Sequence, residues 1–442
     1  MRPANPVRRA FERGSVLIIV LWITFGLVAV TLYFANSTGF ELRASDNRVC
    51  ALAAEQAIEA GARYAAYVLA NHGTNGVLPD YTTYYREAVP VGDAHFWFIG
   101  RNYDSQTPLT QPFFALVDEA SKLNLNSANT NMLDLLPNMT QELSDYIIQW
   151  RSTNSTGSQT YAALHPPYLC KSTNFETVDE LRLVYGASRE LLEGEDSNRN
   201  GVLDPDEYDQ DRNNLADPGL LEYFTVYSRE PNLRPDGSQK FSLRNLNTDQ
   251  LTSLLQTNFD ASRASAIRAR LGNTTTFASP LQFFMRSGMT ADEFGVIADN
   301  LTVASGTYIV GRVNVTTASP AVLCCLPGIT TDLALQLVSY RDANLDRITN
   351  SIAWVVEAIG QNNDSVLQTL AAGDYITVKS YQFTADIAAV GPYGRGYRRV
   401  KYIFDLSNGT PTILYRQDLS HLGWALGREV RQTWLVAKGA TR

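Results

Sequence analysis

The sequence predicts an α+β protein: a long N-terminal helix packed on a small antiparallel sheet, with a large, mainly helical segment inserted between the two halves of that sheet. Three observations predict this class. Residues 15–35 carry no charge and continue into an alanine-rich stretch with helical spacing. Strand-like stretches rich in aromatic and β-branched residues occur at 95–119 and again at 374–406. Between them lies a mainly helical region in which one unit is repeated.

The N-terminal apolar run is long enough to cross a membrane. Its 21 residues span ~32 Å as a helix, against the ~30 Å hydrocarbon core of a bilayer. A cleavable secretory signal has an apolar region of roughly 7 to 15 residues, so this run is too long for one. Four arginines precede it, whereas charges of both signs follow it. By the positive-inside tendency, the leader stays cytoplasmic and the body faces outward.

The helix is expected to continue beyond the membrane as far as His72 and Gly73. Apolar residues recur there at spacings of three and four, as on one face of a helix. They are Val49, Ala53, Ala57, Ala60, Tyr64 and Val68.

This N-terminus resembles that of type IV pilin-like proteins, on its short basic leader, its Arg-Gly junction and its uninterrupted apolar helix. The resemblance implies that a prepilin peptidase cleaves after Gly14 and leaves Ser15 as the new N-terminus. Pilins and most pseudopilins carry glutamate at the fifth mature position, which here is Ile19. In this departure the chain resembles the large minor pseudopilin of type II secretion, that is, the general secretion pathway protein K family.

That resemblance implies a function and a location. The chain would be a minor pseudopilin at the tip of the type II secretion pseudopilus, assisting the export of folded proteins across the outer membrane. Its partners would be other minor pseudopilins and the pseudopilus. It would sit in the inner membrane, single-pass, with a cytoplasmic N-terminus and a periplasmic body.

Ile19 is interpreted as the marker of a tip subunit. The family's glutamate is thought to pair with the N-terminal ammonium of a neighbouring subunit, and an unpaired buried carboxylate is costly. A subunit with no neighbour above it avoids that cost by carrying an apolar residue. The alternative is that Ile19 merely suits a lipid-embedded helix.

One unit occurs twice, at 122–151 and 312–341, and each copy predicts a short extended stretch, a helix, a tight turn with proline and a second helix. A degenerate copy begins at Leu243. At one offset of 190 residues, Leu123-Asn124-Leu125 matches Val313-Asn314-Val315, Leu136-Pro137 matches Leu326-Pro327, and Trp150-Arg151 matches Tyr340-Arg341.

The repeated unit resembles a helix-hairpin-helix module, which gives a rival function: a membrane-anchored, DNA-binding competence protein. Three observations argue against nucleic acid as a partner. Asn138 stands where the turn glycine belongs, the third copy lacks the Pro-Gly turn, and residues 312–341 hold two arginines and no lysine. The chain without its leader is also acidic, with 33 Lys and Arg against 44 Asp and Glu.

The most specific motif is DSNRNGVLDPDE, residues 196–207, which matches the EF-hand calcium loop at every position. Ca²⁺ prefers six to eight oxygen ligands, and this spacing supplies them. An incoming helix is expected within 175–185, whereas the residues after Glu207 predict coil. The alternative is an acidic surface loop that matches by chance. The predicted ligands of a structural Ca²⁺ are Asp196, Asn198, Asn200, the carbonyl of Val202, Asp204 and Glu207.

Strands are expected within 95–103, 112–119, 374–390 and 398–406, with a glycine-rich hairpin turn before the last of these. The basic stretch 394–401 is interpreted as that turn with solvated charges. The predicted organisation is a leader at 1–14, a transmembrane helix at 15–36, a pilin-like domain at 37–118 and 374–421, an inserted domain at 119–373 and a tail at 422–442.

No catalytic function is expected. The four histidines stand far apart in sequence, and the nucleophile-elbow, zinc-protease and phosphate-binding motifs do not occur. The four cysteines, Cys50, Cys170, Cys324 and Cys325, are too sparse for a disulfide framework or a zinc site, so we interpret them as buried thiols.

Overall fold

The computed structural model describes residues 15–73, 76–77, 81–102, 109–153, 157–234 and 236–440. The leader, with Gly14 and the predicted cleavage junction, lies outside the described residues.

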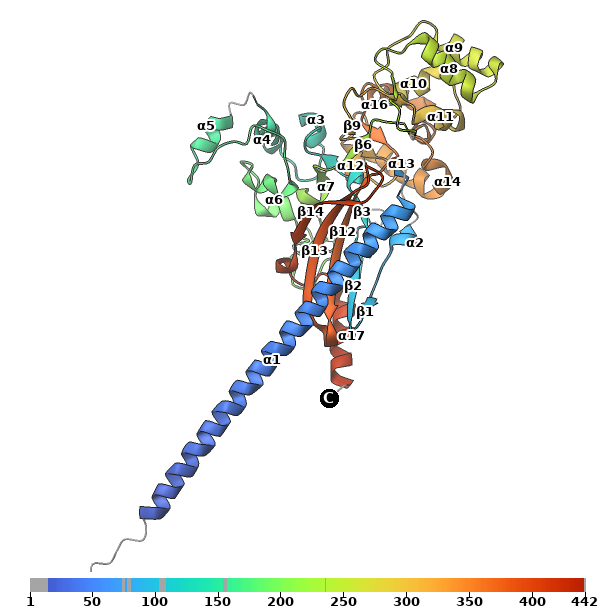
Figure 1. Cartoon of the computed structure of the whole chain (residues 1–442). Coiled ribbons are helices and arrows are strands. Elements are labelled where there is room, and N and C mark those ends of the chain that lie inside the picture. Colours follow the sequence, from blue (N-terminus) through green and yellow to red (C-terminus); the bar gives the residue numbers. More distant parts are fainter. Residues whose placement is uncertain are drawn as a thin grey trace, which may run out of the picture.

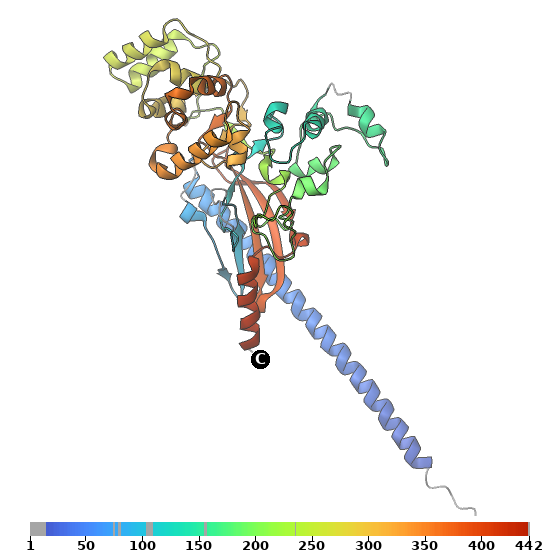
Figure 2. The ribbon, with the colours of Figure 1, turned by 180° about the vertical axis from the view of Figure 1, so that it is seen from behind.

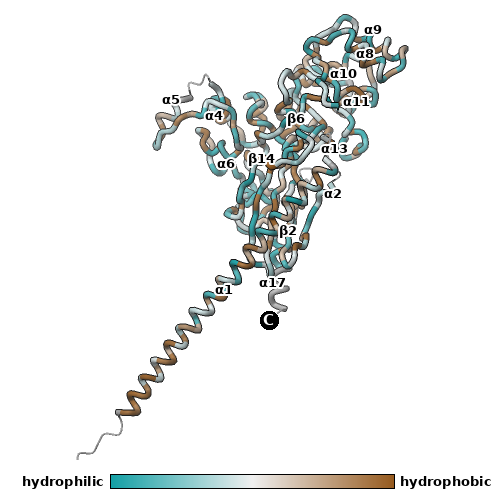
Figure 3. The backbone as a smooth tube through the Cα atoms, viewed as in Figure 1, coloured by the Kyte–Doolittle hydropathy of each residue, from teal (hydrophilic) through white to brown (hydrophobic). Residues whose placement is uncertain are grey.

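Helix α1 (Ser15–His72) is continuous over 58 residues and ends at Gly73, as the spacing predicts. Its first half projects away from the body and its second half crosses the sheet (Figure 1). The projecting half carries most of the apolar colour of α1 (Figure 3). By length and composition, α1 is the one helix in the described part of the chain that could cross a membrane. This fits a single-pass anchor.

The central sheet is antiparallel and is assembled from both ends of the chain. Its strand order is β1-β2-β12-β13-β14, and β3 pairs with the first residues of β12. The prediction of one antiparallel sheet is therefore confirmed. The strands are β1 (Val89–Val91), β2 (Ala94–Ile99), β3 (Val117–Asp118), β12 (Gln382–Gly391), β13 (Arg395–Asp405) and β14 (Thr412–Asp418).

The predicted strand at 112–119 is mostly wrong, because only Val117 and Asp118 form a ladder. The residues before them make isolated backbone hydrogen bonds instead, from Gly100 N to Phe113 O and from Arg86 N to Phe114 O. Likewise β2 ends at Ile99, before the predicted end of its strand, and Tyr103 lies outside the described residues.

Helix α1 packs on one face of the sheet through small residues. The predicted helix face is rotated slightly, because Val49 is 62% exposed while the adjacent Cys50 is 5% exposed. Close approach of the β12–β13 hairpin requires glycine: a Cβ on Gly391 would lie 2.2 Å from the Cys50 carbonyl oxygen. The buried helix residues in this interface are Ala54, Ala57, Ile58, Ala62, Ala65 and Leu69, which face Phe96, Phe98, Ile387, Tyr402 and Phe404.

The inserted domain contains three units that begin and end alike. In each, a first strand is followed by two helices, and a later strand pairs with the first one in parallel. The first unit consists of β4 (Leu123–Asn124), α3 (Thr130–Leu133), α4 (Gln141–Arg151) and β5 (Phe224–Thr225). The second consists of β7 (Phe241–Ser242), α8 (Thr248–Asn258), α9 (Ala261–Leu271) and β8 (Leu301–Thr302). The third consists of β10 (Val313–Asn314), α12 (Pro320–Cys324), α13 (Thr331–Ala343) and β11 (Ile376–Thr377).

The same backbone hydrogen bond closes all three units. Residues Leu125, Leu243 and Val315 each donate their N–H to a threonine carbonyl on the later strand, at 2.7 to 3.0 Å. The threonines are Thr225, Thr302 and Thr377.

The two full copies also share an arginine and a turn. Arg151 donates to the carbonyls of Leu125 and Ala128, and Arg341 donates to those of Val315 and Ala318, the same positions 190 residues later. In the turns, Asn138 has φ 59° and Gly328 has φ 82°. Asparagine tolerates this left-handed conformation, so Asn138 reproduces the backbone of the glycine turn.

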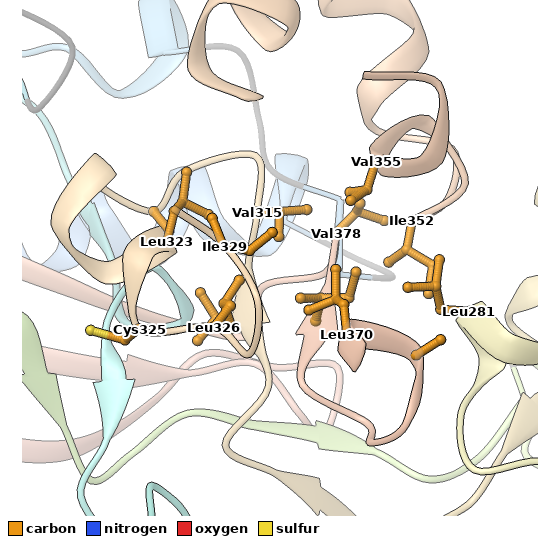
Figure 4. Packing of buried hydrophobic residues seen from close by; sticks show 14 of the residues in the cluster. Leu281, Val315, Leu323, Cys325, Leu326, Ile329, Ile352, Val355, Leu370 and Val378 are labelled. Carbon is orange, nitrogen blue, oxygen red and sulfur yellow. The ribbon is translucent and has the colours of Figure 1, made fainter. Parts of the chain in front are cut away.

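One continuous hydrophobic core runs through the inserted domain. In Figure 4, Val315, Leu323 and Leu326 of the last unit gather near Leu370 and Val378, with Leu281 of α10 at the edge of the group. The other helices of the domain are α5 (Gly157–Ala162), α6 (Arg189–Glu193), α7 (Leu220–Tyr223), α10 (Pro280–Ser287), α11 (Ala291–Ala298), α14 (Leu345–Ile348), α15 (Trp354–Ile359) and α16 (Asp364–Ala371); β6 (Arg229–Pro231) pairs with β9 (Tyr308–Val310).

Besides α1, four described helical elements lie outside that domain: α2 (Tyr81–Tyr84), the turn η5 (Pro392–Gly394) of the β12–β13 hairpin, the 3-10 helix η6 (Ser420–Leu422) and the C-terminal α17 (Gly427–Ala440). From behind, α17 extends below the sheet on the side of the projecting half of α1 (Figure 2).

Candidate metal site

The predicted calcium loop, 196–207, is entered from a different helix than expected. The stretch 175–185 forms a short 3-10 helix, η3 (Val178–Leu183), and α6 is the helix that leads into the loop. Gly194 ends α6 with φ 66°, a conformation that glycine adopts without strain. After Glu207 the chain continues through bends and irregular backbone to Pro218, as the sequence predicts.

The first half of the loop folds around the carboxylate of Asp196. Its two oxygens accept backbone N–H groups from Asn200, at 2.9 Å, and from Gly201, at 2.7 Å. Gly201 makes the sharp bend, with φ 80°. The Asn200 side-chain oxygen accepts from the backbone N–H of Val202 at 2.8 Å. Asp196, Asn200 and Val202 are all buried.

The second half closes over the first. The amide groups of Asn198 and Asn200 both donate to one oxygen of Asp204, at 2.7 and 2.8 Å. Glu207 accepts from the backbone N–H groups of Asn198, at 3.1 Å, and Asp204, at 2.9 Å. The structure therefore brings the predicted ligand side chains together in one loop.

Two observations fit a cation among these residues. The Asn198 side-chain oxygen is buried and has no hydrogen-bond partner within the described part of the chain. Burial also raises the pKa of Asp196, against the opposing charge of Arg101, and burial raises the pKa of Glu207. A buried oxygen without a donor and carboxylates that are costly to ionise both gain from a hard divalent ion. The donor set consists of oxygens alone, which suits Ca²⁺.

A second acidic group adjoins the loop, and the sequence analysis did not predict it. Oxygens of Glu195, Asp211 and Asp217 lie within 4.8 Å of one another, the kind of cluster that could hold a metal ion. A bridge between Gly194 and Pro218 brings the two segments together. The sequence carries a signal for this group, since Asp209, Asp211 and Asn213 stand at every second position in the stretch interpreted as coil.

The loop is attached to the centre of the sheet by arginines. Arg399 of β13 is completely buried and pairs with Asp386 of β12, with N–O distances of 2.9 and 2.7 Å. Its guanidinium also donates to the carbonyls of Asn198 and Arg199. Arg101 donates to the Arg199 carbonyl as well, at 2.8 Å. The expectation of solvated charges at 394–401 is therefore wrong for Arg399, whose partners are distant in sequence.

The remaining predicted residues lie far from this loop. Ser15 begins α1, and Ile19 is 57% exposed on the projecting half of that helix. Cys50 and Cys325 are buried, whereas Cys170 and Cys324 are partly exposed, so the expectation of buried thiols holds for two of the four.

Comparisons with known proteins give one family and one group of structures. Residues 121–194 match the family model described as type II secretion system (T2SS), protein K. This segment holds the first copy of the sequence repeat, 122–151, and ends just before the 196–207 loop. No curated protein matches the chain. Among solved structures, the chain is similar to the GspK–GspI–GspJ complex from the enterotoxigenic Escherichia coli type 2 secretion system. The identity is 9%, the TM-score is 0.43, and the match covers 82% of this chain and 96% of that chain.

The family match falls on the inserted domain, where the internal repeat and the loop-bearing segment begin. Over residues 121–194, the chain is therefore similar to the type II secretion system protein K family.

Proposed function

We propose that this protein is a minor pseudopilin that caps the tip of the type II secretion pseudopilus and assists the export of folded proteins across the outer membrane. The observation that carries the proposal is the protein K match at 121–194 in the inserted domain. That domain is inserted between strands of a sheet that packs on α1. A helix that passes without a break from an apolar span into a folded domain suits a subunit that leaves the membrane to join a fibre.

The proposed location is the inner membrane, with a cytoplasmic N-terminus and a periplasmic body. A prepilin peptidase is proposed to cleave after Gly14. Support comes from the basic leader before an uncharged span and from the absence of any charged side chain between Ser15 and Ala35.

The tip position is proposed from Ile19. Helices of pilin-like subunits bundle in an apolar fibre core, where a carboxylate needs a partner. A subunit without a neighbour above it has no such partner for a glutamate, and Ile19 removes that need. Other minor pseudopilins are then the proposed direct partners.

Structural Ca²⁺ is proposed at the 196–207 loop, bound by Asp196, Asn198, Asn200, Asp204, Glu207 and the Val202 carbonyl. The bound ion would supply positive charge to the buried carboxylates and fix the loop against the sheet. A purely structural role is proposed for the whole chain, without catalysis.

The rival proposal, a DNA receptor, loses support from the contacts of the repeated units. Arg341 and Arg151 donate to carbonyls inside their own units, and Arg312 is buried between Glu230 and Asp374. A phosphate backbone requires basic side chains that face solvent. The guanidinium groups of these arginines already bind protein carbonyls and carboxylates.

Site-specific photocrosslinking in cells tests the proposed function. A crosslinker at Leu21, which is 55% exposed on the projecting half of α1, should give adducts with other minor pseudopilins and few with itself. A matched crosslinker at Asp249, exposed on α8 in the inserted domain, should give no adducts within the fibre core. Abundant self-adducts at Leu21, or a fibre labelled along its whole length, would reject the tip assignment.

A further inference from the structure

The backbone of the calcium loop faces the sheet at Asn198 and Arg199. Both carbonyls accept hydrogen bonds from Arg399, whose other partner is Asp386 in the neighbouring strand. Arg399 is completely buried, so protein groups such as these, and not water, surround its charge. The guanidinium therefore joins two strands of the sheet to one turn of the loop.

Arg199 is held in a conformation that a non-glycine residue avoids. Its φ is 56°, in the left-handed region. Two guanidinium groups, from Arg399 and Arg101, donate to its carbonyl at 2.7 and 2.8 Å. Strain of this kind persists only where surrounding contacts enforce it. The sheet thus enforces the local conformation of the loop.

Asn198 takes part in both the clamp and the predicted metal site. Its carbonyl accepts from Arg399, and its amide donates to Asp204, at 2.7 Å, and to the Trp424 carbonyl, at 3.3 Å. Its side-chain oxygen is the buried acceptor without a donor. A cation that bound this oxygen would order the same residue that the sheet holds.

We propose that calcium in the 196–207 loop locks the inserted domain onto the sheet, and that Arg399 is the positioning residue that transmits the lock. This inference rests on the proposed calcium site and adds to it a coupling between the bound ion and the sheet. Because Arg399 and Ca²⁺ stabilise one arrangement of Asn198 and Arg199, each strengthens the other, as linkage requires. Without Arg399 the loop relaxes at Arg199, and the ion meets ligands that are no longer arranged for it.

The test uses the full chain in detergent or nanodiscs, with CaCl₂ or with chelator. Calcium affinity is measured by titration, and backbone hydrogen exchange is followed in the loop and in β12 and β13. The variants are Arg399→Met and Arg399→Lys. The matched control is Arg229→Met, which breaks the ion pair between Arg229 and Asp405. Asp405 lies on β13, the strand of Arg399, and no described interaction joins Arg229 to the loop.

In the wild type, calcium should slow exchange in β12 and β13 about tenfold, within the usual range of coupling between sites. Arg399→Met should bind calcium at least about tenfold more weakly and lose the effect on the sheet. Arg399→Lys should restore part of both, and Arg229→Met should keep both. If Arg399→Met does not fold, Asp386→Asn, which loosens the grip on Arg399, should lower affinity in the same direction.

Two results would overturn the inference while leaving the calcium site intact: unchanged affinity in folded Arg399 variants, or calcium protection that stays within the loop. If the wild type binds no calcium, the proposed site itself fails, and the inference fails with it.

Discussion

The buried carboxylate of Asp118 should make stability depend on pH in a direction that the structure specifies. Asp118 lies where β3 meets the last repeated unit. One of its oxygens accepts from Asn314 at 3.0 Å and from the hydroxyls of Thr317 and Ser380 at 2.6 Å each. The other accepts from the backbone N–H of Ala120 at 2.8 Å. Burial outweighs these donors and raises the pKa of Asp118 from 3.8 to about 6.

A pKa that is higher in the folded than in the unfolded chain means that the folded chain holds the extra proton. The stability from the protonated form is fully present below pH 3.8 and is lost as the pH rises through about 6. A shift of about two units at about 1.4 kcal/mol per unit gives a loss of about 3 kcal/mol.

The comparison uses Asp118→Asn, which does not titrate, and follows chemical unfolding of both chains between pH 4 and pH 7. The difference in free energy of unfolding between the wild type and the variant should fall by about 2.4 kcal/mol across that interval, because part of the full effect lies below pH 4. Other carboxylates titrate in both chains and cancel in the difference. An advantage that grows with pH would refute the reasoning, because it would mean that the four donors lower the pKa below its unfolded value.

Three further predictions concern the loop, a turn and the membrane helix. Calcium should raise the melting temperature of the chain with an affinity of roughly 10⁻⁴–10⁻³ M, and Glu207→Ala should abolish the shift; identical melting curves in chelator and in excess calcium would contradict this. Asn138→Val should lower the free energy of unfolding by roughly 1–2 kcal/mol in chemical denaturation because β-branched residues resist the left-handed conformation, whereas Asn138→Gly should not lower it. Ile19→Glu should reduce secretion of a reporter substrate by adding an unpaired carboxylate, and wild-type secretion would count against the tip position.

Local signals in the sequence predicted much of the fold. The end of α1 at Gly73, the antiparallel strands around the glycine-rich hairpin and the repeated units all follow from spacing and turn residues that act over short distances. The EF-hand spacing likewise brought its own side chains together. Such features depend on neighbours in the sequence, so the sequence states them directly.

Features that depend on distant partners could not be predicted. The inward face of α1 is set by the position of the sheet, since alanine occurs on several faces of that helix; hence Cys50 is buried and Val49 is not. Arg399 looks like any other arginine in a basic stretch until Asp386 and the loop carbonyls surround it. The second acidic group needs Glu195 and Asp217, which come together only after the chain turns back.

The N-terminus of the mature chain is the most direct test of the central claim, that this is a processed pseudopilin of the protein K type. Intact-mass measurement and N-terminal sequencing of the protein purified from membranes should give a chain that begins at Ser15. Replacement of Gly14 by a bulky residue should leave the leader attached. A wild-type chain that still begins at Met1, or that begins near Thr38 after ordinary signal-peptide cleavage, would contradict the account.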